Sequence, residues 1–292
     1  MAVVGVDLSQ RLVPDGLWEL VVPLMPPFSS RPQGGGTAPL DERAVFTAVV
    51  YVLSSGCAWR HLPETFGVSP ATAHRRFTAW TKAGLWRRLH RAVLDELGAR
   101  GELDWTSAIV DAASVRAKKG GALTGPNPVE RGKKGSKLHV LSEARGIPLA
   151  VAVSGANTHD SQALKPLIRG IPAVRSRRGP RRRRPVKLRA DKAYFSADHL
   201  AWLRERGIIP RIARPGIESS ERLGRHRWKI ERSIAWLFGY RRLAVRYERK
   251  GSHFLAFLGL AAALTCYKKL AKLATSDILS ARPRGRPRTG FA

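Results

Sequence analysis

The period of the hydrophobic pattern changes near residue 104, and this change constrains the fold more than any other feature of the chain. In residues 41–54 the apolar Val45, Ala48, Val49 and Val52 recur at the spacing of one helix face. Beyond residue 104 the apolar residues form short runs bounded by turn residues, which is typical of strands. These runs are residues 108–110, 137–141, 149–153, 186–188 and 207–212. The sequence therefore predicts a helical first third followed by a region that contains a sheet.

The order of the predicted elements beyond residue 104 indicates the fold class. Three strands are followed by a helix at residues 161–168, a strand, a helix at 196–206, a strand, and a long helix at 223–243. This order predicts an α/β domain with a mixed sheet. A last helix at residues 254–273 is apolar almost all round at its start, so we expect it to pack on the sheet domain.

Shifts in composition predict the domain boundaries. Residues 1–100 form a helical domain, and residues 104–275 form the sheet domain. Residues 276–292 contain too little apolar surface to fold and are expected to be a disordered basic tail. Residues 29–39 are rich in Gly, Pro, Ser and Thr and are expected to be a loop, and the Arg-rich residues 175–185 cannot belong to a core.

The charge of the chain points to a polyanionic partner. Lys and Arg number 52 against 22 Asp and Glu, which gives a formal charge of +30, while 43% of the residues are hydrophobic. The chain can thus bury a core and still present a strongly basic surface, and phosphate contacts by Lys and Arg release counterions from nucleic acid. Double-stranded DNA is the leading candidate, and a neutral enzyme of small metabolites is not expected.

The sequence predicts a soluble, cytoplasmic protein. Cys57 and Cys266 are far apart and give neither a disulfide framework nor a metal-ligand spacing. The longest apolar run, residues 254–266, is shorter than the roughly 18 to 20 residues that cross a bilayer, so no membrane partner is expected. The N-terminus lacks the sequence of features that marks a signal peptide.

Residues 63–80 are a helix-turn-helix candidate. A short helical turn at residues 63–66 is followed by Gly67, and Ser69 and Pro70 are suited to begin a second helix. We expect this second helix to contact duplex DNA through its outward side chains, Thr72, His74, Arg75 and Arg76. The alternative is an ordinary helical hairpin with solvated basic residues.

Three carboxylates stand out as possible metal ligands. Asp111 and Asp191 each follow a predicted strand, and sites in open α/β sheets are built just past strand ends. Glu231 lies on the predicted helix 223–243, on a face that Trp228 and Ile234 make half apolar. Hard oxygen ligands of this kind suit a pair of Mg²⁺ ions, which can assist an in-line phosphoryl displacement without a protein nucleophile. Taken singly, each carboxylate could instead be a turn, cap or ion-pair residue.

The sequence resembles the DDE transposases of bacterial insertion sequences, in particular the insertion-sequence-five branch of the IS-four-like superfamily. The resemblance covers roughly residues 17–273. The matching stretches are SSGCAWRHLP at residues 54–63, IVDAASVRAKKGG at 109–121, GKKGSKLHVLSEARGIPLAVAVSGANTHD at 132–160, LRADKAYFS at 188–196 and RWKIERSIAWLFGYRRLAVRYER at 227–249.

The resemblance implies a ribonuclease H-like catalytic domain preceded by a helical, helix-turn-helix-type domain. It implies that Asp111, Asp191 and Glu231 are the catalytic, metal-binding triad. In the Tyr, Arg, Glu and Lys pattern of related superfamilies, Arg227 and Glu231 match, whereas Gly224 and Phe238 replace the Tyr and the Lys. Lys229, Arg232 or Arg241 are candidates to substitute in gripping the terminal phosphates.

Several further residues are candidates for DNA contact or for lining the site. The loop behind Asp111 carries a cation cluster that would suit a phosphate track, with a solvated charged loop as the alternative. The predicted DNA-binding residues of this loop are Lys118, Lys119, Lys133, Lys134 and Lys137. Further predicted DNA-binding residues, elsewhere in the chain, are Lys192, Tyr194, Arg227, Arg284 and Arg286. Tyr194 could equally be core, and Arg284 and Arg286 belong to an AT-hook-like motif or to a nonspecific basic tail.

Three residues near the predicted Asn-Thr-His-Asp segment have separate interpretations. Asn157 and His159 are predicted to line the site. Asp160 is expected to cap the next helix, and His139 is interpreted as a structural residue within a strand.

The hypothesis from the sequence is therefore a bacterial, nucleoid-associated DNA transposase that acts on the terminal inverted repeats of its own element. It would need Mg²⁺, for which Mn²⁺ may substitute, and would act as a dimer or larger synaptic assembly because two ends are joined in one event. No small-molecule substrate is expected. The alternatives are a noncatalytic transposase-derived DNA-binding regulator and a metal-dependent nuclease that cuts without joining.

Overall fold

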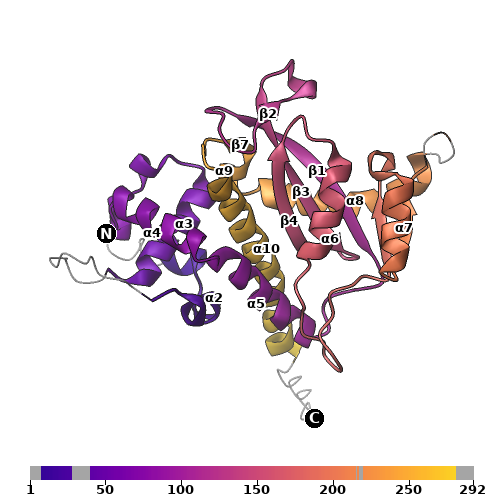
Figure 1. Cartoon of the computed structure of the whole chain (residues 1–292). Helices are drawn as coiled ribbons and strands as arrows, with labels where there is room; N and C mark the ends of the chain where they lie inside the picture. The colour runs from indigo at the N-terminus through magenta and orange to yellow at the C-terminus, as the bar shows by residue number, and fades with distance from the viewer. Residues whose placement is uncertain (1–7, 28–39, 215, 217–219, 281–292) are drawn as a thin grey trace, which may run out of the picture.

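The computed structural model describes residues 8–27, 40–214, 216 and 220–280, and for residues 220–227 and 276–280 it describes the backbone alone. Figure 1 shows the helices of the N-terminal third on one side, the sheet on the other, and one long helix between them.

Four α-helices form most of the N-terminal third, as the hydrophobic period predicted. They are α2 (Asp15–Val21), α3 (Glu42–Ser55), α4 (Pro70–Lys82) and α5 (Leu85–Ala99). Asp41 caps α3 by accepting a hydrogen bond from the backbone N–H of Arg43, and Gly56 ends that helix in the left-handed conformation. Ser69 caps α4 in the same way by accepting from the N–H of Thr72, with Pro70 in the first turn.

The first half of the predicted helix-turn-helix is only a single turn. Residues Glu64–Phe66 form the 3₁₀ turn η3, which Gly67 closes in the left-handed conformation, so no α-helix precedes α4 within residues 63–80. The helix that packs against α4 is instead α3, and Arg76 of α4 pairs with Glu42 of α3 at 2.6 Å. A short Pro-Glu-Thr-Phe-Gly segment is compatible with one turn but gives too few residues for a stable α-helix.

The second region is built on a mixed sheet, as predicted. Its strands are β1 (Ala108–Ala117), β2 (Gly125–Pro126), β3 (Lys134–Glu143), β4 (Pro148–Gly155), β5 (Lys187–Ala190), β6 (Ile209–Ile212) and β7 (Val245–Arg246). The sheet thus has seven strands in the described residues where the sequence predicted five, because the two-residue strands β2 and β7 were missed. The main strands lie in the order β4, β3, β1, β5, β6, with β3 antiparallel to β4 and β1, and with β5 parallel to β1 and β6. This α/β arrangement is the ribonuclease H-like fold that the family resemblance implied.

The helices that follow the strands also match the predicted order, with one exception. The turn η5 (Asp160–Ala163) leads into α6 (Leu164–Gly170), and α7 (Ala197–Glu205) connects β5 to β6. The single helix predicted at residues 223–243 is two helices, α8 (Ser220–Phe238) and α9 (Arg241–Ala244). Buried Tyr240 has an extended backbone between them, and the change of direction lets β7 pair with β1.

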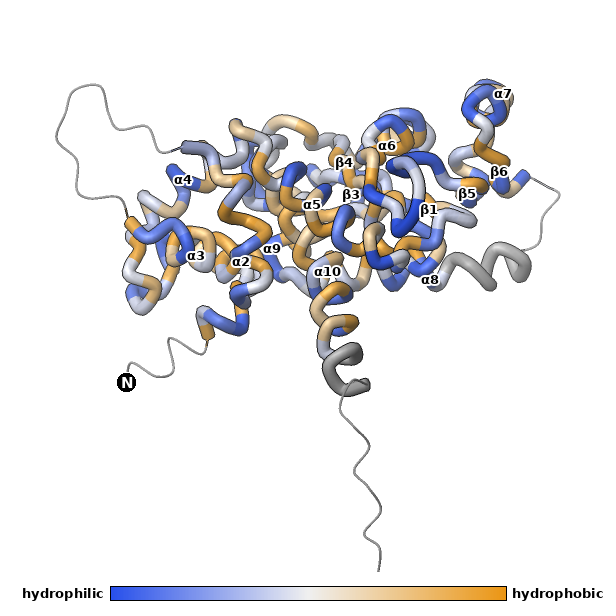
Figure 2. The backbone as a smooth tube through the Cα atoms, turned by 90° about the horizontal axis from the view of Figure 1, so that it is seen from below, coloured by the Kyte–Doolittle hydropathy of each residue, from blue (hydrophilic) through white to orange (hydrophobic). Residues whose placement is uncertain are grey.

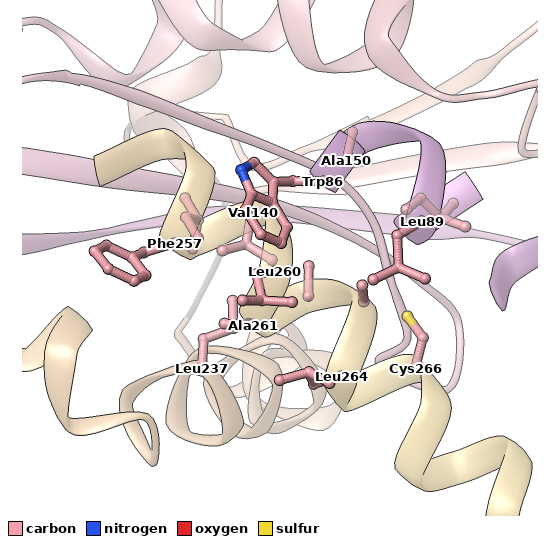
Figure 3. Close-up of a cluster of buried hydrophobic side chains, with 14 of the residues drawn as sticks. Trp86, Leu89, Val140, Ala150, Leu237, Phe257, Leu260, Ala261, Leu264 and Cys266 are labelled. Atoms are coloured by element: carbon pink, nitrogen blue, oxygen red, sulfur yellow. The ribbon is translucent and has the colours of Figure 1, made fainter. Parts of the chain in front are cut away.

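The last helix, α10 (Gly251–Ser280), joins the two regions into one hydrophobic core. It packs against α5 on one side and against β4 and α8 on others. Figure 3 shows Leu260 and Leu264 of α10 among Trp86 of α5, Val140 of β3 and Leu237 of α8. In Figure 2 the apolar stretches of α5, α10 and the strands meet in the middle of the molecule.

Two features of α10 bear on the sequence predictions. Residues 251–275 are long and apolar enough to cross a membrane by length and composition, but 67% of the relevant window is buried inside the protein, as expected of a core helix. The helix continues through Ser280, five residues into the predicted tail of residues 276–292. The remaining tail residues lie outside the described part of the chain.

Burial of His90 predicts how the stability depends on pH. His90 of α5 is buried, its Nε2 lies 2.9 Å from the carbonyl oxygen of Pro148, and burial lowers its pKa from 6.5 to about 4. As the pH falls from 6.5 towards 4, His90 takes up a proton in the unfolded chain but stays neutral in the folded chain. This group alone should cost about 3 kcal/mol of unfolding free energy on acidification across that window.

Chemical denaturation of the wild type and of His90→Gln at neutral and acid pH measures this effect. The variant should lose less stability than the wild type, although His139, whose pKa burial also lowers to about 4, still titrates in both. The exposed His61→Gln serves as the control and should behave as the wild type. Equal pH dependence of the His90 variant and the wild type would contradict the prediction.

Candidate active site

Asp111 lies within a strand and not at its end. The sequence predicted that the strand stops at Val110, but β1 continues to Ala117 because β3 pairs with it from Ala108–Glu143 to Arg116–Gly135. Polar residues along this second half are tolerated because the strand is only partly covered there. The Oδ1 atom of Asp111 accepts a hydrogen bond of 2.8 Å from the N–H of Ala112.

The parallel register of β1 and β5 brings Asp111 beside Asp191. Ala108 pairs with Leu188 and Ile109 with Arg189, so the same offset places Asp111 level with Asp191 on the neighbouring strand path. Asp191 directly follows β5, as predicted, and its side chain accepts a hydrogen bond of 2.8 Å from the N–H of Ala193. Neighbouring strands lie about 4.8 Å apart, so the two aspartates lie side by side on the adjacent paths of β1 and β5.

Tyr194 forms a buried wall beside these carboxylates. The side chain is 1% exposed, and its hydroxyl has no hydrogen-bond partner among the described residues. Burial, followed by the negative charges of Asp160, Asp111 and Asp191, raises the pKa of Tyr194 above its ordinary value. The burial of the side chain favours the alternative that Tyr194 belongs to the core, and its contact with DNA stays a prediction.

Asp160 is the third carboxylate near Tyr194, and it is neutralised by Lys137. Lys137 Nζ lies 2.9 Å from Asp160 Oδ1 and donates to the carbonyl oxygen of Thr158 at 2.8 Å. The Lys137 side chain is only 17% exposed. Lys137 is thus tied to Asp160 within the protein, and its place in a DNA-binding track stays a prediction.

The segment before Asp160 differs from its predicted role in one respect. His159, and not Asp160, caps η5, because its side chain accepts from the N–H of Ser161. Asn157 is exposed, and its side-chain amide lies against Gly125. His139 is buried with Nε2 at 2.8 Å from Ser154 Oγ, which agrees with its structural interpretation.

Glu231 is exposed on α8, contrary to the half-apolar environment expected from the sequence. The helix packs on β1 and β3 through Ile230, Ser233 and Leu237, and Ser233 donates to the carbonyl oxygen of Gly146 at 2.7 Å. Glu231 lies to one side of this buried face, so the argument from desolvation cost does not apply to it. Within the described ranges, no three Asp, Glu, His or Cys side chains gather closely enough to hold a metal ion.

The paired aspartates nevertheless have the chemistry of a divalent-cation site. Asp111 and Asp191 are half-buried oxygen donors on adjacent strand paths, and hard cations such as Mg²⁺ take one or two carboxylates and keep several waters. Two of the three predicted ligands therefore fit a divalent ion.

The predicted DNA-binding side chains of α4 differ in how far they are exposed to solvent. Arg75 and His74 are exposed, whereas Thr72 is half-buried at the start of the helix. Arg76 is held by Glu42, with a side chain only 14% exposed, so it is a poor candidate for contact with DNA. The helix can thus present its first two turns to a duplex mainly through Arg75 and His74.

The remaining basic candidates are exposed or lie outside the described residues. Lys118, Lys119, Lys133, Lys134 and Lys192 are exposed. The side chain of Arg227 lies outside the described residues, as do Arg284 and Arg286 of the tail.

Arg232, one candidate for gripping phosphates, is already engaged within the protein. Its guanidinium donates to the carbonyl oxygen of Arg145 at 2.6 Å and lies 4.6 Å and 4.8 Å from the ring centroids of Trp228 and Trp236. Lys229 and the exposed Arg241 are not held by such a hydrogen bond to a loop carbonyl.

Glu143 is a buried carboxylate that the sequence analysis missed. It accepts hydrogen bonds of 2.8 Å from the backbone N–H groups of Asp104, Arg145 and Ile147 and thereby fixes the turn between β3 and β4. Burial raises its pKa to about 6. A Glu just before an Ala-Arg-Gly turn was the only signal of this role.

Comparison with protein families identifies the chain. A family model described as "Putative transposase of IS4/5 family (DUF4096)" matches residues 13–90, and one described as "Transposase DDE domain" matches residues 106–266, more than half of the chain. The chain belongs to the DDE transposase family. The transposase has the metal-dependent polynucleotidyl transferase activity of that family, and the resemblance stated from the sequence is confirmed.

Two curated relatives come from Burkholderia cepacia. The transposase is 44% identical over 149 residues to the "Putative transposase for insertion sequence element IS402", which covers 51% of this chain and 71% of the relative. It is 37% identical over 123 residues to the "Insertion element IS402 uncharacterized 16.2 kDa protein", which covers 41% of this chain and 84% of that one.

Solved structures of lower similarity include the Mos1 strand transfer complex. That comparison covers 85% of this chain and 81% of the other, with 13% identity and a TM-score of 0.32. The Mos1 mariner paired end complex with Mn covers 85% and 82% with 13% identity and a TM-score of 0.25. With TM-scores this low, these structures support no conclusion about the transposase.

The buried hydroxyl of Tyr194 gives a test of the site's packing. Replacing Tyr194 by Phe removes a polar atom that no described residue satisfies, so the unfolding free energy should stay unchanged or rise by about 1 kcal/mol. Tyr194→Ala leaves a cavity and should cost about 3 to 5 kcal/mol. Denaturant titrations compare the two variants with the wild type. A loss above about 1 kcal/mol in Tyr194→Phe would mean that the hydroxyl has a stabilising partner.

Proposed function

We propose that the transposase binds the terminal inverted repeats of its own element, cuts the strands at the element ends, and transfers the freed 3′ hydroxyl ends to target DNA. The observation that carries this proposal is the register of β1 and β5, because it sets Asp111 level with Asp191 on adjacent strand paths. Phosphoryl transfer of this kind depends on positioning and charge neutralisation, and two carboxylates fixed on neighbouring strands supply the positioning.

The residues proposed to hold the divalent ions are Asp111, Asp191 and Glu231. Mg²⁺, for which Mn²⁺ can substitute, would activate the attacking oxygen and stabilise the leaving oxygen when bound. Asp111 and Asp191 provide the fixed part of this ligand set, because both side chains accept backbone hydrogen bonds that restrict their rotation. Glu231 on α8 is proposed to complete the set from the adjacent helix.

The surrounding residues orient the site and control its charge. Tyr194 closes the core behind the carboxylates and excludes water from that side. Lys137 holds Asp160 so that the latter does not add an uncompensated negative charge. The exposed Lys192, which directly follows Asp191, is placed to contact a phosphate of the bound strand.

The N-terminal helices and the basic loop are proposed to bind the duplex. Arg75 and His74 of α4, together with Lys118, Lys133 and Lys134, are exposed cations or donors that would contact phosphates and base edges. Because two element ends must react together, we propose a dimer or larger synaptic assembly, acting on the bacterial nucleoid in the cytoplasm.

The experiment that tests this function uses full-length protein, labelled element ends, a plasmid target and Mg²⁺. Asp111→Asn and Asp191→Asn should each lower strand joining by about a hundredfold or more while DNA binding persists, because each removes a negative ligand and leaves the basic surface intact. Asp198→Asn is the matched control, since the Asp198 side chain is 71% exposed on α7 and pairs with Lys165 on the surface. It should leave joining unchanged.

The outcomes separate the proposed function from its alternatives. Joined product in the wild type supports a transposase that acts on its own ends, and cut product without joining would indicate a nuclease. Retarded DNA with neither product would indicate a noncatalytic regulator. Full joining by Asp111→Asn would overturn the assignment of the catalytic residues.

A further inference from the structure

A groove of about 490 Å³ lies between the N-terminal helices and the sheet region. It is bordered by α4 and by Trp59, the first residue of η2 (Trp59–His61), on one side, and by the loop after β1, by α9 and by the start of α10 on the other. Figure 1 shows α9 and β7 beside the upper end of α10, at the junction of the two regions. The groove thus draws residues from widely separated parts of the chain.

Two histidines lie edge to face in this groove. The ring centroids of His74 from α4 and His253 from α10 are 5.6 Å apart. Trp59 packs on His74 at 5.3 Å, and Phe77 packs on His253 at 5.4 Å, so both rings are held in place by aromatic neighbours. No ring nitrogen of either histidine makes a hydrogen bond to another residue in the described ranges. Both imidazoles can therefore still bind a ligand.

The charged side chains that line the groove around the histidines have a net positive charge. The ionisable side chains that line the groove, besides the histidines, are Lys119, Arg242, Tyr247, Glu248, Arg249 and Lys250. Glu248 is the one carboxylate among these lining residues, and Arg242 pairs with it at 2.7 Å, with both side chains almost fully buried. That pair cancels its own charge, whereas Lys119, Arg249 and Lys250 are exposed.

The backbone around these cations is fixed before any ligand binds. Ala122 donates to the carbonyl oxygen of Arg249 at 3.0 Å, and Lys118 donates to that of Arg246 at 2.9 Å. Gly121 has a φ of 111°, and a Cβ there would lie 2.2 Å from the same Arg249 oxygen, so this close approach requires glycine. The loop that carries Lys119 is therefore held against the segment that carries Lys250.

We propose that this groove is a phosphate site that grips the DNA backbone where it passes from α4 to the sheet region, and that it binds more tightly when His74 and His253 take up protons. This inference rests on the proposed function, because it adds a DNA contact outside the carboxylate site. Three exposed cations and two unsatisfied imidazoles are complementary to a phosphate oxygen cluster and not to an apolar or cationic ligand.

A DNA phosphate fits the groove better than a free anion would. The groove is open to solvent and continuous with the exposed face of α4, which carries Arg75 one residue after His74. A duplex that contacts α4 would therefore bring its backbone to the groove, and the linked phosphates add affinity that a free phosphate lacks.

The direction of the pH dependence follows from the surroundings of the two rings. Burial, followed by the positive charge of Lys250 and Arg242, lowers the pKa of His74, and the Glu248 charge opposes this. Burial, followed by His74 and Lys250, lowers the pKa of His253. Both imidazoles are thus neutral in the free protein near neutral pH. A bound phosphate favours their charged forms, so binding takes up protons and becomes weaker as the pH rises.

The test measures fluorescence anisotropy of a fluorescein-labelled duplex of mixed sequence with the full-length protein at fixed salt. From about pH 6 to about pH 8 the wild-type affinity should fall about threefold to tenfold. His74→Gln and His253→Gln should each flatten this dependence, and His61→Gln, an exposed histidine outside the groove, should not. Melting curves by circular dichroism check that each variant is folded.

Two variants of exposed groove residues test the phosphate site independently, in case a histidine variant fails to fold. Lys119→Gln and Lys250→Gln should weaken binding up to about tenfold and each reduce the slope of log affinity against log salt by about 1. Arg204→Gln on α7, also exposed, is the control and should leave the slope unchanged.

The outcomes distinguish this inference from the proposed function. Tight DNA binding with the same pH dependence in wild type, His74→Gln and His253→Gln, and with unchanged salt slopes in both lysine variants, would overturn the phosphate site alone. Absence of DNA binding at every pH would overturn the proposed function. If inorganic phosphate at equal phosphate concentration competes as well as unlabelled duplex does, the site takes a free anion and not the DNA backbone.

Discussion

Burial of α10 between α5 and the sheet is the interaction on which the rest of the structure depends. Leu260, Ala261 and Leu264 are within about 5% of full burial, and each large apolar side chain buried in this way contributes about 1.5 to 3 kcal/mol. The helix contacts both the N-terminal helices and the strands, so it makes one core from regions that the sequence divides at about residue 100. The orientation of α4 relative to the sheet, and with it the groove around His74 and His253, follows from this packing.

The carboxylate site depends on a different constraint, the hydrogen-bond register of the central strands. Because β1 and β5 are parallel and paired with a fixed offset, Asp111 and Asp191 arrive at the same level although 80 positions separate them in the chain. A slip of one residue would turn one side chain to the opposite face of the sheet. The helix α8 is positioned separately, by Ser233 against the close backbone approach at Gly146, so Glu231 depends on the packing of a helix and not on strand register.

The excess of positive charge is divided between internal and external uses. Lys137, Arg76 and Arg242 are bound by Asp160, Glu42 and Glu248, and each of these pairs fixes one element against another. An unpaired charge in such positions would carry a large desolvation cost, which explains why the few acidic side chains are placed there. The exposed Lys and Arg side chains that remain form the basic surface available to DNA. Counting cations along the sequence therefore overestimates the surface available to a phosphate.

The sequence by itself determined the class of fold, the order of the five longest strands and of the helices between them, and the family, because hydrophobic period, turn residues and motif letters are local properties of the chain. It also determined that Asp191 follows a strand and that Ser69 begins α4. Only the tertiary structure decided that β1 runs past Asp111, that Tyr194 is enclosed, that Glu231 is exposed, and that His159 caps η5 in place of Asp160. These outcomes depend on partners distant in sequence: strand β3 extends β1, and Lys137 pairs with Asp160. Burial, register and ion pairing are properties of such distant contacts, and a pattern read along one segment does not contain them.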